Sequence, residues 1–138
     1  MLEIRGLRKK YGNFQALDGL DLEIPKGELF GFVGPNGAGK STVLNIISRL
    51  IARDSGLVEF EGQDISRWKS KELAKRLAIL TQSNNIQMKL TVRELVRFGR
   101  FPYSGNHPTK EDQEMIDKAI RYMEQAEFED RFIEALSG

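Results

Sequence analysis

The stretch that decides the fold of this chain is FGFVGPNGAGKSTVLNIISRL, residues 30–50. Three of the 13 glycines in the sequence lie within residues 34–39, between a short apolar run and a helix-like pattern. After the glycines, apolar residues recur at helical spacing, namely Val43, Leu44, Ile46, Ile47, Leu50 and Ile51. This order predicts a buried strand, a glycine-rich turn and then an amphipathic helix that begins at about Gly39.

Residues 34–41, GPNGAGKS, fit the pattern G-x-x-x-x-G-K-[ST] of phosphate-binding loops. Backbone N–H groups converge on a phosphate in a tight loop with positive φ, which glycine adopts without strain. The following helix adds the unpaired N–H groups and the partial positive charge of its N-terminus. We therefore expect Lys40 to reach the β- and γ-phosphates and Ser41 to ligate Mg²⁺. The simpler alternative is a glycine-rich turn without a ligand.

The composition is that of a globular chain of one-domain length. Of the 138 residues, 40% are hydrophobic and 30% are charged, which favours a folded protein over a disordered one. The net charge of +1 gives no reason to expect binding to nucleic acid. Because the sequence has no cysteine, disulfides and thiolate metal sites are excluded. We find no signal-peptide pattern and no apolar run of membrane-spanning length, so we expect a cytoplasmic protein.

Alternation of apolar and polar residues predicts strands on both sides of the glycine-rich stretch. LEIRGLRKKYG and FQALDGLDLEI, separated by Gly12-Asn13, predict a hairpin. LFGFVG predicts a short buried strand, GLVEFEGQDI an alternating strand and SKELAKRL a helix. AILTQ predicts a strand that ends at Gln82. There a mixed α/β part, residues 1–82, gives way to an α-helical part, residues 83–138.

The last part of the sequence predicts two capped helices. Thr91 and Glu94 have the spacing of a capping box, and the helix that they open stops at Gly99. Thr109 is expected to cap the second helix. The buried stripe of that helix is expected to contain Met115, Ile116, Ile120 and Met123.

Several charged or titratable residues of the helical part are interpreted without a catalytic role. Arg97 and Arg100 are interpreted as an exposed helix face, with a contact to a partner protein as the alternative. The acidic residues of TKEDQE indicate a favourable first helical turn rather than a catalytic carboxylate pair. His107, the one histidine, is interpreted as part of a solvated loop.

Read together, YG, ALDGLDLEI, GE, GFVGPNGAGKST, GQDI, ILTQ and the terminal LSG resemble the nucleotide-binding domain of ATP-binding-cassette (ABC) transporters. The resemblance covers the whole chain but only the N-terminal half of that domain. It implies a fragment of an α/β fold of the P-loop NTPase, ABC ATPase-like type, with an N-terminal antiparallel β-subdomain and a C-terminal α-helical subdomain. The segment TVRELVRFGRFPYSGNHPTKEDQEMIDKAI is similar to ATPases that serve importers of iron–siderophore and related metal chelates.

The resemblance also implies roles for individual residues. Tyr11, 29 positions before Lys40, matches the adenine-stacking aromatic of the family. Gln82 matches the Q-loop glutamine, which touches Mg²⁺ or the attacking water and contacts the membrane partner. Leu136, Ser137 and Gly138 match the start of the signature motif, which binds the γ-phosphate held by the opposite subunit. The implied catalytic residues are Lys40 and Gln82, and the implied metal ligands are Ser41 and Gln82. The implied nucleotide-binding residues are Tyr11, Ala16, Gly34, Pro35, Asn36, Gly37, Ala38, Gly39, Lys40, Ser41, Thr42, Gln82, Ser137 and Gly138.

As a member of this family the chain would bind ATP and Mg²⁺ at the inner face of the cell membrane. Its partners would be permease subunits and a second ATPase copy, and the transported substrate an iron chelate. One alternative is an engineered or truncated half-domain without a transport role. Another is a soluble ABC ATPase without a permease. A P-loop kinase or GTPase is poorly supported, because no guanine-reading motif is present.

The family's Walker B carboxylates and switch histidine follow the signature motif, and the sequence ends before them. Because general-base help is worth about 10²–10⁴ in rate, we expect nucleotide binding with negligible turnover. The LFGFVG strand would also lack its neighbour, and an unpaired apolar edge invites pairing with another chain. We therefore expect self-association, or a rearrangement that covers this edge.

Overall fold

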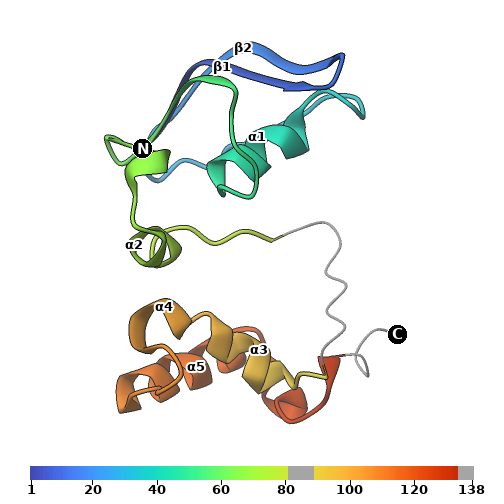
Figure 1. The fold of residues 1–138 in the computed structure, drawn as a ribbon. Helices are drawn as coiled ribbons and strands as arrows, with labels where there is room; N and C mark the ends of the chain where they lie inside the picture. Colours follow the sequence, from blue (N-terminus) through green and yellow to red (C-terminus); the bar gives the residue numbers. More distant parts are fainter. Residues whose placement is uncertain (81–88, 134–138) are drawn as a thin grey trace. The chain divides into compact units, whose positions relative to one another are not determined.

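The computed structural model describes residues 1–80 and 89–133, and the chain divides into two compact units (Figure 1). The sheet unit comprises Met1–Leu73 and Leu77–Ile79. The helical unit comprises Ala74–Arg76 and Leu80–Gly138. In the described part of the chain, no helix has the length and apolar character that crossing a membrane requires.

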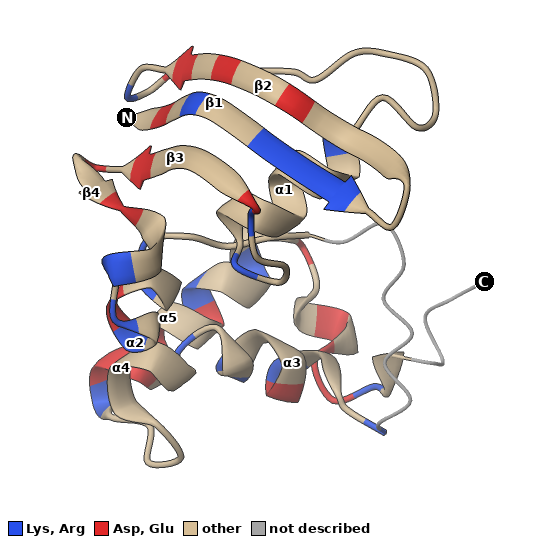
Figure 2. Cartoon of the chain, turned by 45° about the horizontal axis from the view of Figure 1, so that its top comes forward, with Lys and Arg blue, Asp and Glu red and all other residues tan. Residues whose placement is uncertain are grey.

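The sheet unit is built on the predicted hairpin. Strands β1 (Leu2–Tyr11) and β2 (Phe14–Ile24) pair antiparallel around a turn in which Gly12 has a φ of 56°. Strands β3 (Ser55–Phe60) and β4 (Gln63–Asp64) extend the sheet in the order β2-β1-β3-β4, and all neighbours are antiparallel. Arg8 of β1 faces Asp18 of β2 and forms an ion pair with it, where the long basic segment of β1 lies beside an acidic segment of β2 (Figure 2), and this cross-strand pair favours the pairing. The prediction of an N-terminal antiparallel β-subdomain is confirmed.

Helix α1 (Lys40–Ile47) buries Val43, Ile46 and Ile47 of the predicted apolar pattern in the core of the sheet unit. Leu44 and Leu50 of the same pattern are exposed at 44% and 62%. The helix begins directly after Gly39, as expected, but ends at Ile47, before the apolar pattern does. In the turn that follows α1, Arg49 has a positive φ of 62°. The 3-10 turn η1 (Ile65–Arg67) and the short helix α2 (Ser70–Ala74) follow β4. The core consists of Ile4, Leu7, Leu17, Val43, Ile46, Ile47, Val58, Ile65 and Leu73.

The prediction of a strand at LFGFVG, residues 29–34, is wrong. These residues are described and form no strand, and the side chains of Leu29 and Val33 are fully exposed. Residues 78–80 of the predicted strand AILTQ likewise form no strand, and the rest of that strand lies outside the described residues. An extended apolar segment becomes a strand only when a neighbour supplies hydrogen bonds, and no described segment does so here.

The helical unit contains the two predicted capped helices. Helix α3 (Val92–Phe98) starts with a complete capping box of Thr91 and Glu94 and has Gly99 at its C-cap. Helix α5 (Lys110–Tyr122) starts with a second box, in which Asp112 is the partner of Thr109. Between them lies the short helix α4 (Phe101–Ser104), and the 3-10 turn η2 (Ala126–Phe128) follows α5. Both capping predictions are confirmed.

The predicted stripe of α5 is half wrong. Ile116 and Ile120 are buried, but Met115 and Met123 are exposed at 43% and 65%. The buried face of α5 consists of Asp112, Ile116 and Ile120, which are spaced four residues apart. It therefore begins nearer the N-terminus than predicted and excludes both methionines.

The interpretation of Arg100 as part of a solvated helix face is also wrong, because its side chain is only 16% exposed. Asp112 lies in the first turn of α5, as predicted. Asp112 is only 2% exposed, and it accepts a hydrogen bond of 2.6 Å from Nε of Arg100. Hydrogen bonds from the Thr109 backbone N–H and the Arg100 guanidinium hold the pKa of Asp112 well below its usual range. A buried carboxylate needs such partners, so the pair links α4 to the start of α5. His107 is exposed, as predicted.

Candidate nucleotide-binding site

The glycine-rich loop stands at the N-terminus of α1. Gly37 and Gly39 have φ values of 85° and 81°, the left-handed region that glycine adopts freely. The N–H of Ala38 donates to the carbonyl of Pro35 at 3.2 Å, and the N–H of Val43 donates to that of Gly39 at 3.0 Å. The loop is therefore a tight turn that continues directly into the helix, as the sequence predicts.

The Lys40 side chain folds back across this loop. Its Nζ donates to the carbonyl oxygen of Gly34 at 2.6 Å and to that of Pro35 at 2.8 Å. The positive charge is thus held over the turn by neutral carbonyl groups and not by a carboxylate. An anion that enters the loop can therefore take over the ammonium without breaking an ion pair.

Gly39 lies against strand β2. A Cβ atom on Gly39 would stand 2.7 Å from the carbonyl oxygen of Ala16 and 2.7 Å from Cδ2 of Leu17. Ala16 is the extra residue of β2 between Gln15 and Leu17, which pair with Lys10 and Lys9. Ala16 therefore lies beside the glycine-rich loop, at an irregularity of β2.

Tyr11 ends strand β1, and its side chain is 46% exposed. The Nζ of Lys9 lies 5.5 Å from the centroid of the Tyr11 ring. That ammonium is paired with Oδ1 of Asp54 at 2.8 Å. The hydrogen bond from Lys9, followed by one from the Lys10 backbone N–H, lowers the pKa of Asp54. The sequence analysis missed Lys9 and Asp54. Strand alternation could have linked Lys9 to Tyr11, but nothing local points to Asp54.

The donors at the loop suit a polyphosphate. The first turn of α1 offers N–H groups without partners inside the helix, and none of its side chains is acidic. Ser41 is exposed and Thr42 is half-buried beside Lys40. A hydroxyl oxygen is a ligand that Mg²⁺ accepts together with phosphate oxygens. The described residues contain no cluster of three or more His, Asp or Glu that could hold a metal ion.

The sequence pattern of the ABC transporter family matches residues 17–138, a span that includes the whole glycine-rich loop. The chain belongs to the ABC transporter family. The fold agrees with this membership. A dimeric bacterial ABC transporter cassette superposes with a TM-score of 0.82 at 30% identity, over 100% of this chain and 64% of that one. A nucleotide-free ATP-binding cassette from an ABC transporter superposes with a TM-score of 0.73 at 30% identity, over 94% and 56%.

Relatives within the ABC transporter family include proteins named for iron-compound import. The petrobactin import ATP-binding protein YclP of Bacillus subtilis (strain 168) is 47% identical over 100% of this chain and 55% of its own length. The hemin import ATP-binding protein HmuV of Streptomyces coelicolor is 41% identical over 96% of this chain and 48% of its own length. The chain thus spans about half the length of the curated relatives it matches.

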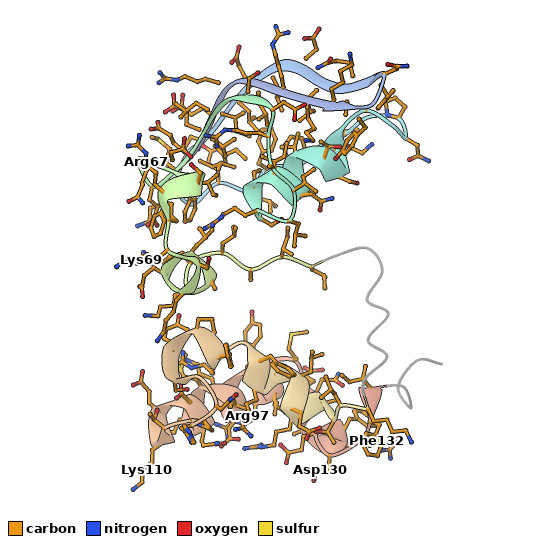
Figure 3. The ribbon with its side chains drawn as sticks, viewed as in Figure 1. Arg67, Lys69, Arg97, Lys110, Asp130 and Phe132 are labelled. Atoms are coloured by element: carbon orange, nitrogen blue, oxygen red, sulfur yellow. The ribbon has the colours of Figure 1, made fainter. Side chains whose placement is uncertain are left out.

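The remaining predicted site residues of this ABC transporter family member are Gln82, Ser137 and Gly138, which lie outside the described residues. The helical unit has a separate cavity of about 260 Å³ on α3 and α4. Arg97, labelled in Figure 3, donates from Nη2 to the carbonyl of Asn106 at 3.0 Å on its wall. The cavity is lined by Leu90, Glu94, Arg97, Phe98, Phe101, Gly105 and Asn106.

Proposed function

We propose that this chain is the Mg-ATP-binding part of an ABC importer for iron–siderophore or related metal chelates. The observation that carries the proposal is the position of Lys40, whose ammonium lies over a left-handed glycine turn at the start of α1. The ammonium, the backbone amides and the hydroxyls are all hydrogen-bond donors. Together they complement the negative charge of a triphosphate.

In this proposal the loop residues share the triphosphate. Amides of residues 36–41 bind the phosphate oxygens, Lys40 bridges the β- and γ-phosphates, and Ser41 ligates Mg²⁺. Tyr11 supplies an aromatic face for the adenine, and Ala16 lies beside the loop through its contact with Gly39. Gln82, Ser137 and Gly138 stay predicted contacts to Mg²⁺ and to the nucleotide of a second copy.

Isothermal titration of Mg-ATP into the purified 138-residue chain tests this site. We expect binding by the wild type and at least about a tenfold loss of affinity in Lys40→Ala, because a charge-assisted hydrogen bond is lost. Lys26→Ala is the matched control, since Lys26 is an exposed lysine of the same unit outside the loop. Equal affinities in all three proteins would favour a half-domain without a nucleotide site.

For the 138 residues as printed, we propose binding without steady turnover. They contain no apolar strand pattern followed by an Asp-Glu pair that could activate water. A phosphate-release assay on the purified chain should therefore stay at the level of Lys40→Ala. Sustained release by the wild type alone would contradict this part of the proposal.

The iron-chelate substrate is proposed on the strength of relatives named for petrobactin and hemin import. Disruption of the gene that encodes this chain should abolish uptake of a labelled iron chelate by the cells. Uptake of an unrelated substrate, such as an amino acid, should be unchanged. Normal iron-chelate uptake after disruption would favour the alternative of an ABC ATPase that works without a permease.

We propose the cavity of the helical unit as the contact for a membrane permease. Phe98 and Phe101 are half-exposed apolar side chains there, and Arg97 supplies a polar wall. Exposed aromatic residues beside a cavity are typical of interface anchors. Phe101→Ser should reduce co-purification with the permease, whereas Tyr122→Ser, an exposed aromatic on α5, should not.

We also propose that the isolated chain self-associates. Residues 29–33 hold a fully exposed leucine and a fully exposed valine and have no strand partner among the described residues, which suits pairing with the same segment of a second copy.

A further inference from the structure

Asp54 forms hydrogen bonds with three consecutive residues near the end of β1, namely Arg8, Lys9 and Lys10. Its backbone N–H donates to the carbonyl of Arg8 at 3.1 Å. Its Oδ1 accepts from Nζ of Lys9 at 2.8 Å, and its Oδ2 accepts from the backbone N–H of Lys10 at 2.7 Å. Three consecutive residues are thus fixed directly before Tyr11, although Asp54 is 44 positions away from Lys10.

Lys9 transmits this restraint to the Tyr11 ring. Its side chain is only 15% exposed, so the ammonium occupies one place, 5.5 Å from the ring centroid. A cation over one face of an aromatic ring is attracted by the ring quadrupole and holds that face. The Tyr11 side chain is otherwise half-exposed at the end of the strand, where a rotamer would be free to change.

We propose that Lys9, held by Asp54, is a positioning residue that orients Tyr11 for stacking on the adenine of the nucleotide. This inference rests on the proposed function and deepens it. Lys9 keeps one face of the ring occupied and leaves the other face for the base. A pre-oriented ring loses less rotamer entropy when the nucleotide binds, which increases the affinity. Because the ring contacts only the base, this gain in affinity does not extend to the phosphates. The charge of Lys9 is already matched by Asp54, so a direct role toward the phosphates is not part of the proposal.

Two ligands separate these effects, namely Mg-ATP and Mg-tripolyphosphate, which has no base. Lys9→Met keeps the side-chain stem and removes the ammonium. We expect it to weaken Mg-ATP binding about three- to tenfold and to leave tripolyphosphate binding unchanged. Lys10→Met is the matched control, because the Lys10 side chain is exposed and only its backbone contacts Asp54. Lys10→Met should bind both ligands like the wild type.

A double-mutant cycle with Tyr11→Ala completes the test. In the Tyr11→Ala background, Lys9→Met should cause no further loss of Mg-ATP affinity. A second variant, Asp54→Asn, should weaken Mg-ATP selectively in the same way. The proposal is overturned if Lys9→Met weakens both ligands equally, if it acts fully in the Tyr11→Ala background, or if it matches Lys10→Met. A wild type that binds neither ligand would instead refute the proposed nucleotide site, and the role of Lys9 with it.

Discussion

The carbonyl oxygen of Ala16 lies 2.7 Å from the point that a Cβ atom on Gly39 would occupy. Helix α1 therefore begins in direct contact with the backbone of β2, and the loop before it cannot shift without moving the sheet. The same contact joins two sequence positions that the resemblance had assigned to the nucleotide separately. Gly39 is therefore required for two reasons, namely its positive φ and the lack of space for a Cβ atom.

Gly39→Ala should destabilise the sheet unit and abolish Mg-ATP binding. The left-handed φ alone costs about 1 kcal/mol for alanine, and the clash with Ala16 should raise the total to at least about 2 kcal/mol. Gly62→Ala is the control, because Gly62 has a φ of 77° but a Cβ there would meet no atom of the described residues within 4 Å. Urea unfolding followed by circular dichroism should rank the two variants, and equal losses would refute the steric argument.

Asp64 should make the stability of the sheet unit depend on pH. Hydrogen bonds from Arg53, and then from Ser66, lower the pKa of Asp64 from 3.8 to about 2. Because the folded-state pKa is lowered, the stabilisation is fully present above about pH 4 and is lost as the pH falls toward about 2. It amounts to at most about 2 kcal/mol. Urea titrations should show a smaller loss in Asp64→Asn than in the wild type, and the part that remains includes Asp54, whose pKa is also lowered.

Two aspartates of α5 accept hydrogen bonds of equal length but differ in burial, so they test how burial affects the contribution of an ion pair to stability. Asp112 accepts from Arg100 at 2.6 Å and is 2% exposed, whereas Asp117 accepts from Arg93 at 2.6 Å and its side chain is 41% exposed. Asp117→Asn should cost about 0.5 kcal/mol, as for a solvated ion pair. Asp112→Asn should destabilise the helical unit clearly more, because it leaves the Arg100 cation poorly solvated. Thermal unfolding that ranks the two variants equally would contradict this reasoning.

Leu29→Asp should reduce self-association of the chain. A charge at this fully exposed position opposes pairing of residues 29–33 with the same residues of a second copy. Leu50→Asp is the matched control, because Leu50 is also exposed but follows α1 and is not part of residues 29–33. Sedimentation velocity should show a concentration-dependent mass for the wild type and Leu50→Asp, and a monomer for Leu29→Asp. A monomeric wild type would end the self-association proposal.

Features that depend on neighbouring residues followed from the sequence alone. The hairpin around Gly12-Asn13, the start of α1 after Gly39, and the caps at Thr91 and Thr109 were predicted correctly. Each rests on the φ that a glycine permits or on a side chain that reaches an N–H three residues away, so a short window contains all the necessary information. The loop with Lys40 is of the same kind.

Features that depend on a distant partner were decided by the tertiary structure. LFGFVG has the composition of a strand, yet strand hydrogen bonds come from another segment, and the described residues supply none. Asp112 has the pattern of a first helical turn, and the packing of α4 and α5 then buries it against Arg100. Likewise the approach of Ala16 to Gly39, and of Asp54 to Lys9, joins residues that are 23 and 45 positions apart. Local conformation is set by short-range sterics and capping, whereas burial and pairing are set by whatever the folded chain brings alongside.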